Sequence, residues 1–229
     1  MKKILITLAG IAMTMGVAMA QDYQKNIFGV NAGLNLSNFP GNFFENVNKT
    51  KAGFHVGVSY ERLLKNNLPL YLETGLQYSM KGCAIKYFDE KGNATASYLQ
   101  IPVMVNYKFR LTDDISLYPS LGLYYGIALG GNEVYKYEGE KESYPLFGKK
   151  GYFNRSDVGL RVSATAGYKR FTLSIGYEFG FINMVKPEGG DYDYDDYSLT
   201  RADYDYDYDI DFKPKAHTGN FFISVGYKF

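Results

Sequence analysis

The chain of 229 residues contains one cysteine, Cys83, and no tryptophan. A single cysteine cannot form an internal disulfide framework, so an exported chain of this length must be stable without one. We expect Cys83 to be a loop thiol with no chemical role. Proline is scarce, at seven residues, and long periodic helix patterns are absent. Glycine and tyrosine, at 25 and 23 residues, are abundant, which is typical of many strands separated by turns.

Neither sign of charge dominates, because the chain contains 25 basic and 24 acidic residues. This balance gives no indication of a nucleic-acid partner, and we expect none. After the first twenty residues no segment approaches about 18 consecutive apolar residues, so no transmembrane helix is predicted. Any membrane-spanning segment of the mature chain must therefore be a strand.

The first twenty residues have the pattern of a secretory signal peptide: two early lysines, an apolar stretch, and the small residues Ala18 and Ala20 before a cleavage site. Gln21 follows the cut, where a bacterial lipoprotein would carry cysteine, so no lipid anchor is indicated. We expect residues 1–20 to be removed and residues 21–229 to form one exported domain.

Eight segments alternate between apolar and small or polar residues, the period of a β-strand. In "FTLSIGYEFGF" every second residue from Phe171 to Phe181 is apolar. Pro102 and Pro119 interrupt two of the segments, and we expect bulges or local distortion there. The eight segments are residues 28–37, 53–62, 70–81, 96–109, 115–128, 156–169, 171–182 and 220–229.

The links between these segments alternate between short and long. Short turns at one end and long loops at the other are the signature of outer-membrane barrels. We therefore predict an all-β, eight-stranded antiparallel up-and-down transmembrane barrel, monomeric, with short periplasmic turns, periplasmic termini and long extracellular loops. An even number of strands lets the last strand pair with the first and leaves no open edge.

The polar face carries eleven glycines, which are disfavoured in strands unless another group approaches closely. A narrow lumen filled by side chains supplies that approach, so the polar face is predicted to be inside. Aromatic residues gather at the short-turn ends of the apolar face, as in a girdle at a lipid interface. They are Phe28, Tyr60, Tyr107, Phe109, Tyr168, Phe171, Tyr227 and Phe229. We expect outer-membrane lipid against this face, and transient recognition of Tyr227 and Phe229 by the barrel-assembly machinery.

Charged residues on the lumen face are the first candidate site. The predicted cluster is His55, Glu61, Glu73, Lys108, Arg161, Glu178 and Lys228, with Gln77, Lys81 and Gln100 on the same face. Buried charges persist when paired, which favours a salt-bridged plug; a polar conduit is the alternative. A hydrolase is a third reading, but His55, Ser59 and Glu61 would spread over roughly 20 Å along a strand. We predict no catalytic residue, cofactor or metal.

The second candidate is the acidic loop at residues 183–218, which has ten acidic and four basic side chains. One reading is a β-ribbon whose tyrosines contact an envelope or extracellular protein, although opposed aspartates would then need a cation or a basic partner. The other reading is a solvated acidic loop. The contact candidates are Asp191, Tyr192, Asp193, Tyr194, Tyr204, Asp205, Tyr206, Asp207 and Tyr208.

Several stretches are similar to a known family. "LPLYLETGLQYSMKG", "SYLQIPVMVNYKF", "DVGLRVSATAGY", "LSIGYEFGFINM" and "GNFFISVGYKF" resemble the PorT-like small outer-membrane β-barrels of Bacteroidetes over nearly the whole mature chain. The resemblance implies an outer-membrane barrel without a catalytic motif, and some members are linked to secretion machinery. We therefore expect a non-enzymatic protein for surface recognition or an accessory part of an envelope or secretion assembly. The alternatives are a narrow porin-like channel or transporter, and a lipid- or peptide-modifying enzyme.

Overall fold

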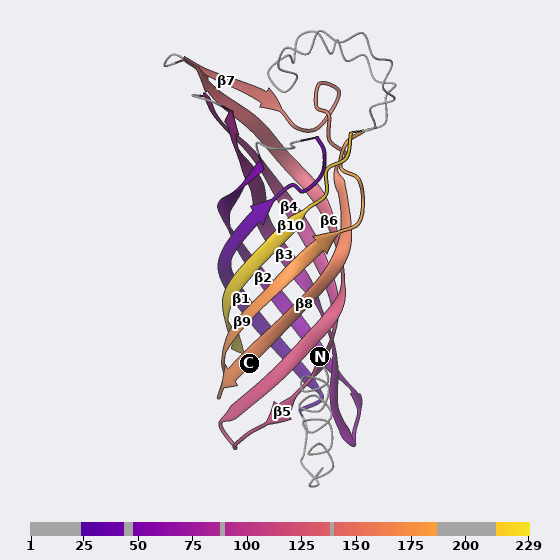
Figure 1. The fold of residues 1–229 in the computed structure, drawn as a ribbon. Coiled ribbons are helices and arrows are strands. Elements are labelled where there is room, and N and C mark those ends of the chain that lie inside the picture. Colours follow the sequence, from indigo (N-terminus) through magenta and orange to yellow (C-terminus); the bar gives the residue numbers. More distant parts are fainter. Residues whose placement is uncertain (1–23, 44–47, 88–89, 138–139, 187–213) are drawn as a thin grey trace, which may run out of the picture.

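The computed structural model describes residues 24–43, 48–87, 90–137, 140–186 and 214–229 (Figure 1). Ten strands join in one sheet in which every neighbouring pair is antiparallel. They are β1 (Asn26–Asn38), β2 (Asn48–Lys65), β3 (Leu68–Tyr87), β4 (Glu90–Tyr107), β5 (Phe109–Arg110), β6 (Ile115–Tyr137), β7 (Glu140–Pro145), β8 (Ser156–Tyr168), β9 (Phe171–Gly180) and β10 (Gly219–Lys228). Within the described ranges, no helix has the length and apolar character needed to cross a membrane.

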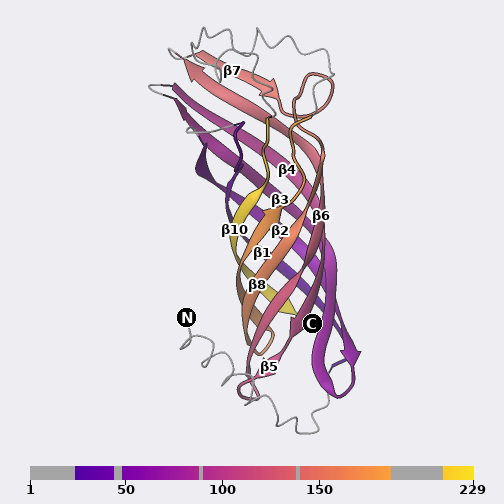
Figure 2. The ribbon, with the colours of Figure 1, turned by 45° about the vertical axis from the view of Figure 1, so that its right-hand side comes forward.

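The sheet closes on itself into a barrel of tilted strands (Figures 1 and 2). β1 pairs with β10 from Gly29↔Lys228 to Asn38↔Gly219, and β4 pairs with β6 on the far side of the ring. Eight strands form the wall, while β5 is a two-residue piece and β7 pairs only with β6. The predicted all-β antiparallel barrel of eight strands is confirmed.

The two faces of the wall differ as predicted. The outer face exposes large apolar side chains around the ring, whereas the alternate positions are small, polar or charged and turn inward. At Gly33 an added Cβ would lie 2.1 Å from the Ile223 carbonyl oxygen and 2.5 Å from His55 Cε1, so only glycine allows this close approach. The exposed set includes Val30, Leu34, Val56, Val58, Leu76, Ile101, Val103, Leu121, Leu123, Leu129, Leu173, Ile175, Ile223 and Val225.

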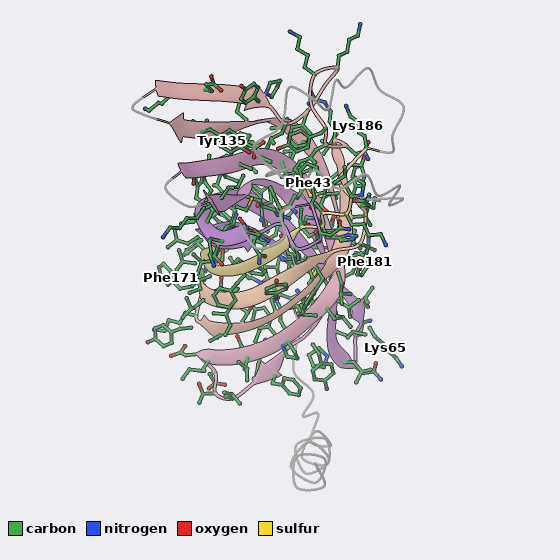
Figure 3. All side chains as sticks on the ribbon, turned by 45° about the horizontal axis from the view of Figure 1, so that its top comes forward. Phe43, Lys65, Tyr135, Phe171, Phe181 and Lys186 are labelled. Atoms are coloured by element: carbon green, nitrogen blue, oxygen red, sulfur yellow. The ribbon has the colours of Figure 1, made fainter. Side chains whose placement is uncertain are left out.

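The two ends of the barrel also differ. At one, the turn end, the connections are short, and Lys169 adopts φ 53° in the two-residue turn between β8 and β9. The main-chain nitrogen of Phe229 donates to the Phe28 carbonyl, so the last described residue lies at this end. Aromatic rings pack together here, with the centroids of Phe171 and Tyr227 5.3 Å apart. At the opposite end, the loop end (Figure 3), longer connections join β1 to β2, β7 to β8 and β9 to β10, whereas β3–β4 and β6–β7 are joined by two residues each.

Neither proline produces a bulge, but the β3–β4 ladder is interrupted at Pro102, so the predicted local distortion is confirmed there and is absent at Pro119. The β3–β4 ladder omits the pairs opposite Pro102 but resumes in the same register, and Thr74 Oγ1 donates to the Pro102 carbonyl at 2.9 Å. Pro119 lies one residue beyond the last β4–β6 pair, where no donor is needed from it. The bulge in β6 is at Leu129, because Ser97 pairs with Gly130 and Tyr98 pairs with Ala128.

Four wall strands run past their predicted ends at the loop end. β2, β3, β4 and β6 continue there and β7 is added, forming a projecting sheet made of residues 48–51, 82–87, 90–96, 130–137 and 140–145 (Figure 2). Cys83 lies inside β3 and is fully buried, so its assignment to a loop was wrong. The cause is that Cys83 packs under loop residues, a long-range contact that alternation does not reveal.

Candidate functional site

A buried ion network occupies the lumen toward the loop end. Lys81 Nζ lies 3.3 Å from Asp157 Oδ2 and 2.9 Å from Glu178 Oε2. Arg161 Nη1 lies 3.2 Å from Glu178 Oε1. Lys81 also sits over the ring of Tyr124 at 4.6 Å. We call Lys81, Asp157, Arg161 and Glu178 the loop-side cluster; its two cations balance its two carboxylates.

Hydrogen bonds complete the loop-side cluster. Thr218 Oγ1 donates to Asp157 at 3.0 Å, and Asn220 Nδ2 donates to Glu178 Oε2 at 3.1 Å. These donors come from the start of β10 and its approach, so the last wall strand holds the carboxylates supplied by β8 and β9. Carboxylates with several donors and cations tolerate burial, which explains why this cluster persists away from water.

A second ion network lies toward the turn end. Lys108 and Lys228 both pair with the buried Glu61, and Asn106 Nδ2 donates to Glu73. Lys108 Nζ lies 4.3 Å from the centroid of the Tyr71 ring. We call Glu61, Glu73, Lys108 and Lys228 the turn-side cluster. It also balances two cations against two carboxylates, so the lumen has no net charge from these eight groups.

A small polar cavity separates the two clusters. Its volume is about 70 Å³, and both Arg161 of the loop-side cluster and Lys228 of the turn-side cluster line it. That volume holds a few water molecules and no larger solute. Serine and threonine hydroxyls line part of the cavity wall, from Ser59, Ser120, Ser163, Thr165, Thr172, Ser174 and Ser224.

The structure places all seven predicted lumen residues inside the barrel but divides them between two sites. Arg161 and Glu178 join the loop-side cluster; Glu61, Glu73, Lys108 and Lys228 form the turn-side cluster; and His55 lies beside the former. Sequence reasoning missed Asp157, although its position in β8 has the same parity as Arg161 and indicated the lumen.

The three residues weighed for a hydrolase do not come together. His55 Nδ1 is 2.9 Å from Asn35 Oδ1, and Nε2 is 3.0 Å from Ser224 Oγ. Glu61 is bonded to lysines in the turn-side cluster, and Ser59 lines the cavity. With both ring nitrogens of His55 occupied, no nucleophile and base pair forms from this trio. Among the described residues, no cluster of three or more His, Cys, Asp or Glu side chains is placed to hold a metal ion.

An apolar cap covers the lumen at the loop end. Loop segments tie to one another by main-chain bonds: Asn154 N donates to the Met184 carbonyl and Met184 N to the Ala216 carbonyl, both at 2.7 Å. Phe43 packs partly buried on this cap, which Figure 3 shows at the loop end. The buried members are Phe39, Cys83, Ile85, Ala94, Ala96, Tyr98, Ala128, Leu146, Phe147, Phe153, Met184, Val185 and Ala216.

One carboxylate is buried in the cap. Glu133, 4% exposed, accepts hydrogen bonds from the hydroxyls of Tyr135 and Tyr152. Burial raises the pKa of Glu133 above its usual range, and the two tyrosine hydroxyls offset part of that rise.

The cap should therefore lose stability as pH rises. Because the folded-state pKa of Glu133 is raised, the cap is most stable below about pH 4, the range where the carboxyl is protonated folded or unfolded. The free-energy cost of ionising the buried Glu133 carboxyl grows with pH and levels off once pH exceeds the pKa of Glu133 in the folded protein. We expect Glu133→Gln to remove this dependence. The measurement is the hydrogen-exchange rate of the Asn154 and Met184 amides in wild type divided by the rate in Glu133→Gln. This ratio should rise several-fold from pH 4 to pH 8. A flat ratio would show that Glu133 does not titrate in the cap.

Two predicted features lie wholly or partly outside the described residues. The cleavage-site residues Ala18, Ala20 and Gln21 do, as do the loop candidates from Asp191 to Tyr208. The flanks of that loop are described, and Met184 and Ala216 belong to the cap. Tyr227 and Phe229 pack against each other at the turn end with centroids 5.2 Å apart, while their role in insertion stays a prediction.

A closed barrel with an apolar outer wall and a polar, ion-paired lumen is the architecture of an integral outer-membrane protein. The model of the family described as "Outer membrane protein beta-barrel domain" matches residues 19–186. The chain belongs to that family, and it is a bacterial outer-membrane protein.

Solved structures with similar folds are outer-membrane and surface proteins. Ail, the attachment invasion locus protein of Yersinia pestis, is 16% identical over 90% of this chain and 100% of its own, with a TM-score of 0.37. Neisserial surface protein A is 14% identical over 88% and 97%, with a TM-score of 0.43. OprG of Pseudomonas aeruginosa is 11% identical over 92% and 99%, with a TM-score of 0.45. No curated protein matches the sequence.

Proposed function

We propose that this protein is a non-enzymatic, monomeric barrel that presents a recognition surface outside the cell. The observation that carries the proposal is the closed lumen: two ion-paired clusters and the cap lie in series along it. At the same time the projecting sheet extends beyond the apolar wall at the loop end. A barrel that is filled inside and elaborated at one end serves presentation better than conduction.

The loop end faces the outside in this proposal, and the turn end with its aromatic rings faces the periplasm. Short turns on the periplasmic side and longer extracellular connections are the rule for such barrels. The acidic segment at residues 183–218 is a further candidate contact for an envelope or extracellular protein. The similarity to PorT-like barrels of Bacteroidetes supports an accessory role in an envelope or secretion assembly.

A narrow channel is the second candidate, because the polar cavity would carry water if both ion clusters opened. Purified full-length protein in planar lipid bilayers decides between the two. We expect no unit conductance above the bare bilayer at 1 M salt, since Lys81 and Glu61 hold opposite ends of the lumen closed. A large porin measured in the same bilayer serves as the control for insertion. Reproducible conductance steps would contradict the proposal and favour the channel.

A further inference from the structure

Four lysines stand in one row across the projecting sheet. Lys86 of β3 is directly opposite Lys91 of β4, and Lys91 is directly opposite Lys136 of β6. Lys136 is in turn opposite Lys141 of β7. Neighbouring strands lie about 4.8 Å apart, so the row spans roughly 14 Å.

The same face carries two more lysines below this row. Lys49 is opposite Ala84, which shares a face with Lys86 two residues further along β3. Lys51 lies over Gly82 on that face, because a Cβ built on Gly82 would be 3.1 Å from Lys51 Cδ. The alternate β3 residues, such as Ile85, are buried in the cap, so the lysine face looks outward. We call Lys49, Lys51, Lys86, Lys91, Lys136 and Lys141 the lysine face.

Acidic positions of the projecting sheet lie on the opposite face. Glu133 is opposite Ala94, and Glu142 is opposite Tyr135, both one residue out of step with the lysine row. Glu140 pairs with Tyr137 in the same alternate register. By register, the lysine positions therefore fall on one face of the sheet and the glutamate positions on the other.

This arrangement is costly for the fold by itself. Like charges directly opposite each other destabilise a sheet. A lysine on an edge strand protects against unwanted strand pairing, which accounts for Lys141 on β7. It does not account for Lys91 and Lys136, because β4 and β6 are paired on both sides. A positive potential concentrated on one face is suited to an anionic ligand.

We propose that the lysine face binds an acidic polysaccharide, a linear chain that bears sulfate or carboxylate groups at regular intervals. A row of lysine positions, one on each of four neighbouring strands, matches repeated anionic groups better than it matches one compact anion. The inference rests on the proposed function, which puts the loop end outside the cell.

The position of the row disfavours a lipid headgroup as the occupant. Leu129 is the last strongly exposed apolar residue of the β6 wall, and Lys136 is seven residues beyond it. Seven residues of strand cover roughly 20 Å. With a strand tilt of about 45°, this places Lys136 roughly 15 Å beyond Leu129 along the membrane normal. The headgroup layer extends only about 5–8 Å beyond the hydrocarbon on each side.

The test measures binding of dextran sulfate to the full-length protein in nanodiscs of neutral phosphatidylcholine. Wild-type protein should bind dextran sulfate at low salt, lose it at high salt, and not bind neutral dextran. Lys91→Glu should weaken binding at least tenfold, since it reverses a charge in the middle of the row. The matched control is Lys65→Glu, the same charge change at an exposed lysine at the turn end, which should leave binding unchanged.

Folding of the variant is controlled separately. Lys91→Glu places an acid between Lys86 and Lys136, which favours the sheet, so resistance of the projecting sheet to protease should hold or rise while binding falls. A lysine face with a purely structural role would not show these opposite changes. Lys91→Gln provides a second variant without charge reversal, with a smaller loss of binding expected.

Three results would overturn the proposal. The first is equal binding of dextran sulfate by wild type and Lys91→Glu. The second is binding to phosphatidylglycerol vesicles without binding to dextran sulfate, which would make a lipid headgroup the occupant. The third is binding that appears only after deletion of residues 191–211, which would make the chain's own acidic segment the occupant. Conductance in bilayers would contradict the proposed function and leave this binding result standing.

Discussion

Replacing Lys81 with methionine should destabilise the barrel by about 3–5 kcal/mol, because it leaves buried carboxylates without their cation. Lys81 is 1% exposed and is the group that joins Asp157 to Glu178. Glu178 would retain Arg161, but Asp157 would keep only hydroxyl donors such as Thr218. Methionine has a similar volume, so the expected loss comes from the unpaired charge and not from a cavity.

Urea unfolding of the purified protein in micelles, followed by the shift between folded and unfolded gel mobility, measures this change. Lys65→Met is the matched control at an exposed position, and it should stay within about 0.5 kcal/mol of wild type. A triple variant, Lys81→Met with Asp157→Asn and Glu178→Gln, should recover part of the loss because no buried charge then lacks a partner. A loss below about 1 kcal/mol for Lys81→Met alone would show that water reaches the cluster.

The barrel itself was predictable from the sequence because lipid imposes a strict period of two. Phe171, Leu173 and Ile175 point outward, and Gly176 and Glu178 point inward, as alternation requires. The same alternation predicts which charged residues face the lumen. It does not predict which lysine pairs with which carboxylate, because that depends on strand register and tilt around the ring. The division into two clusters, with Glu61 in one and Glu178 in the other, therefore emerged only from the structure.

The loop end was not predictable in the same way. Beyond Leu129 no lipid separates the faces, so hydrophobic alternation in β6 stops although the strand continues to Tyr137. A period of two persists there in the sign of the charge, as in "EKES" of β7, and that pattern was an unused signal for a strand. The lysine row depends on cross-strand register, which one chain without an alignment does not specify. The cap depends on contacts between distant segments, such as Phe153 with Val185.

Replacing Phe153 with alanine should open the cap and leave the barrel intact. Phe153 is 1% exposed, and its ring lies 4.5 Å from that of Tyr152 and 5.8 Å from that of Phe39 by centroids. Its main chain also bonds to Leu146. Truncating a buried phenylalanine costs about 3–5 kcal/mol. The cost should fall on the cap alone, because the strand ladders of the wall do not depend on this ring.

Hydrogen exchange resolves the two regions. The amides of Asn154 and Met184, which bond across the cap, should exchange roughly a hundredfold to a few thousandfold faster in Phe153→Ala, since each 1.4 kcal/mol is a factor of ten. Amides of β1 and β10, such as Val225, should keep their protection. Phe171→Ala is the matched control, because that ring is 64% exposed at the turn end and its loss should leave the cap unchanged. Equal acceleration of cap and wall amides in Phe153→Ala would mean that cap and barrel unfold as one unit, and that the loop end cannot rearrange around a ligand while the wall stays closed.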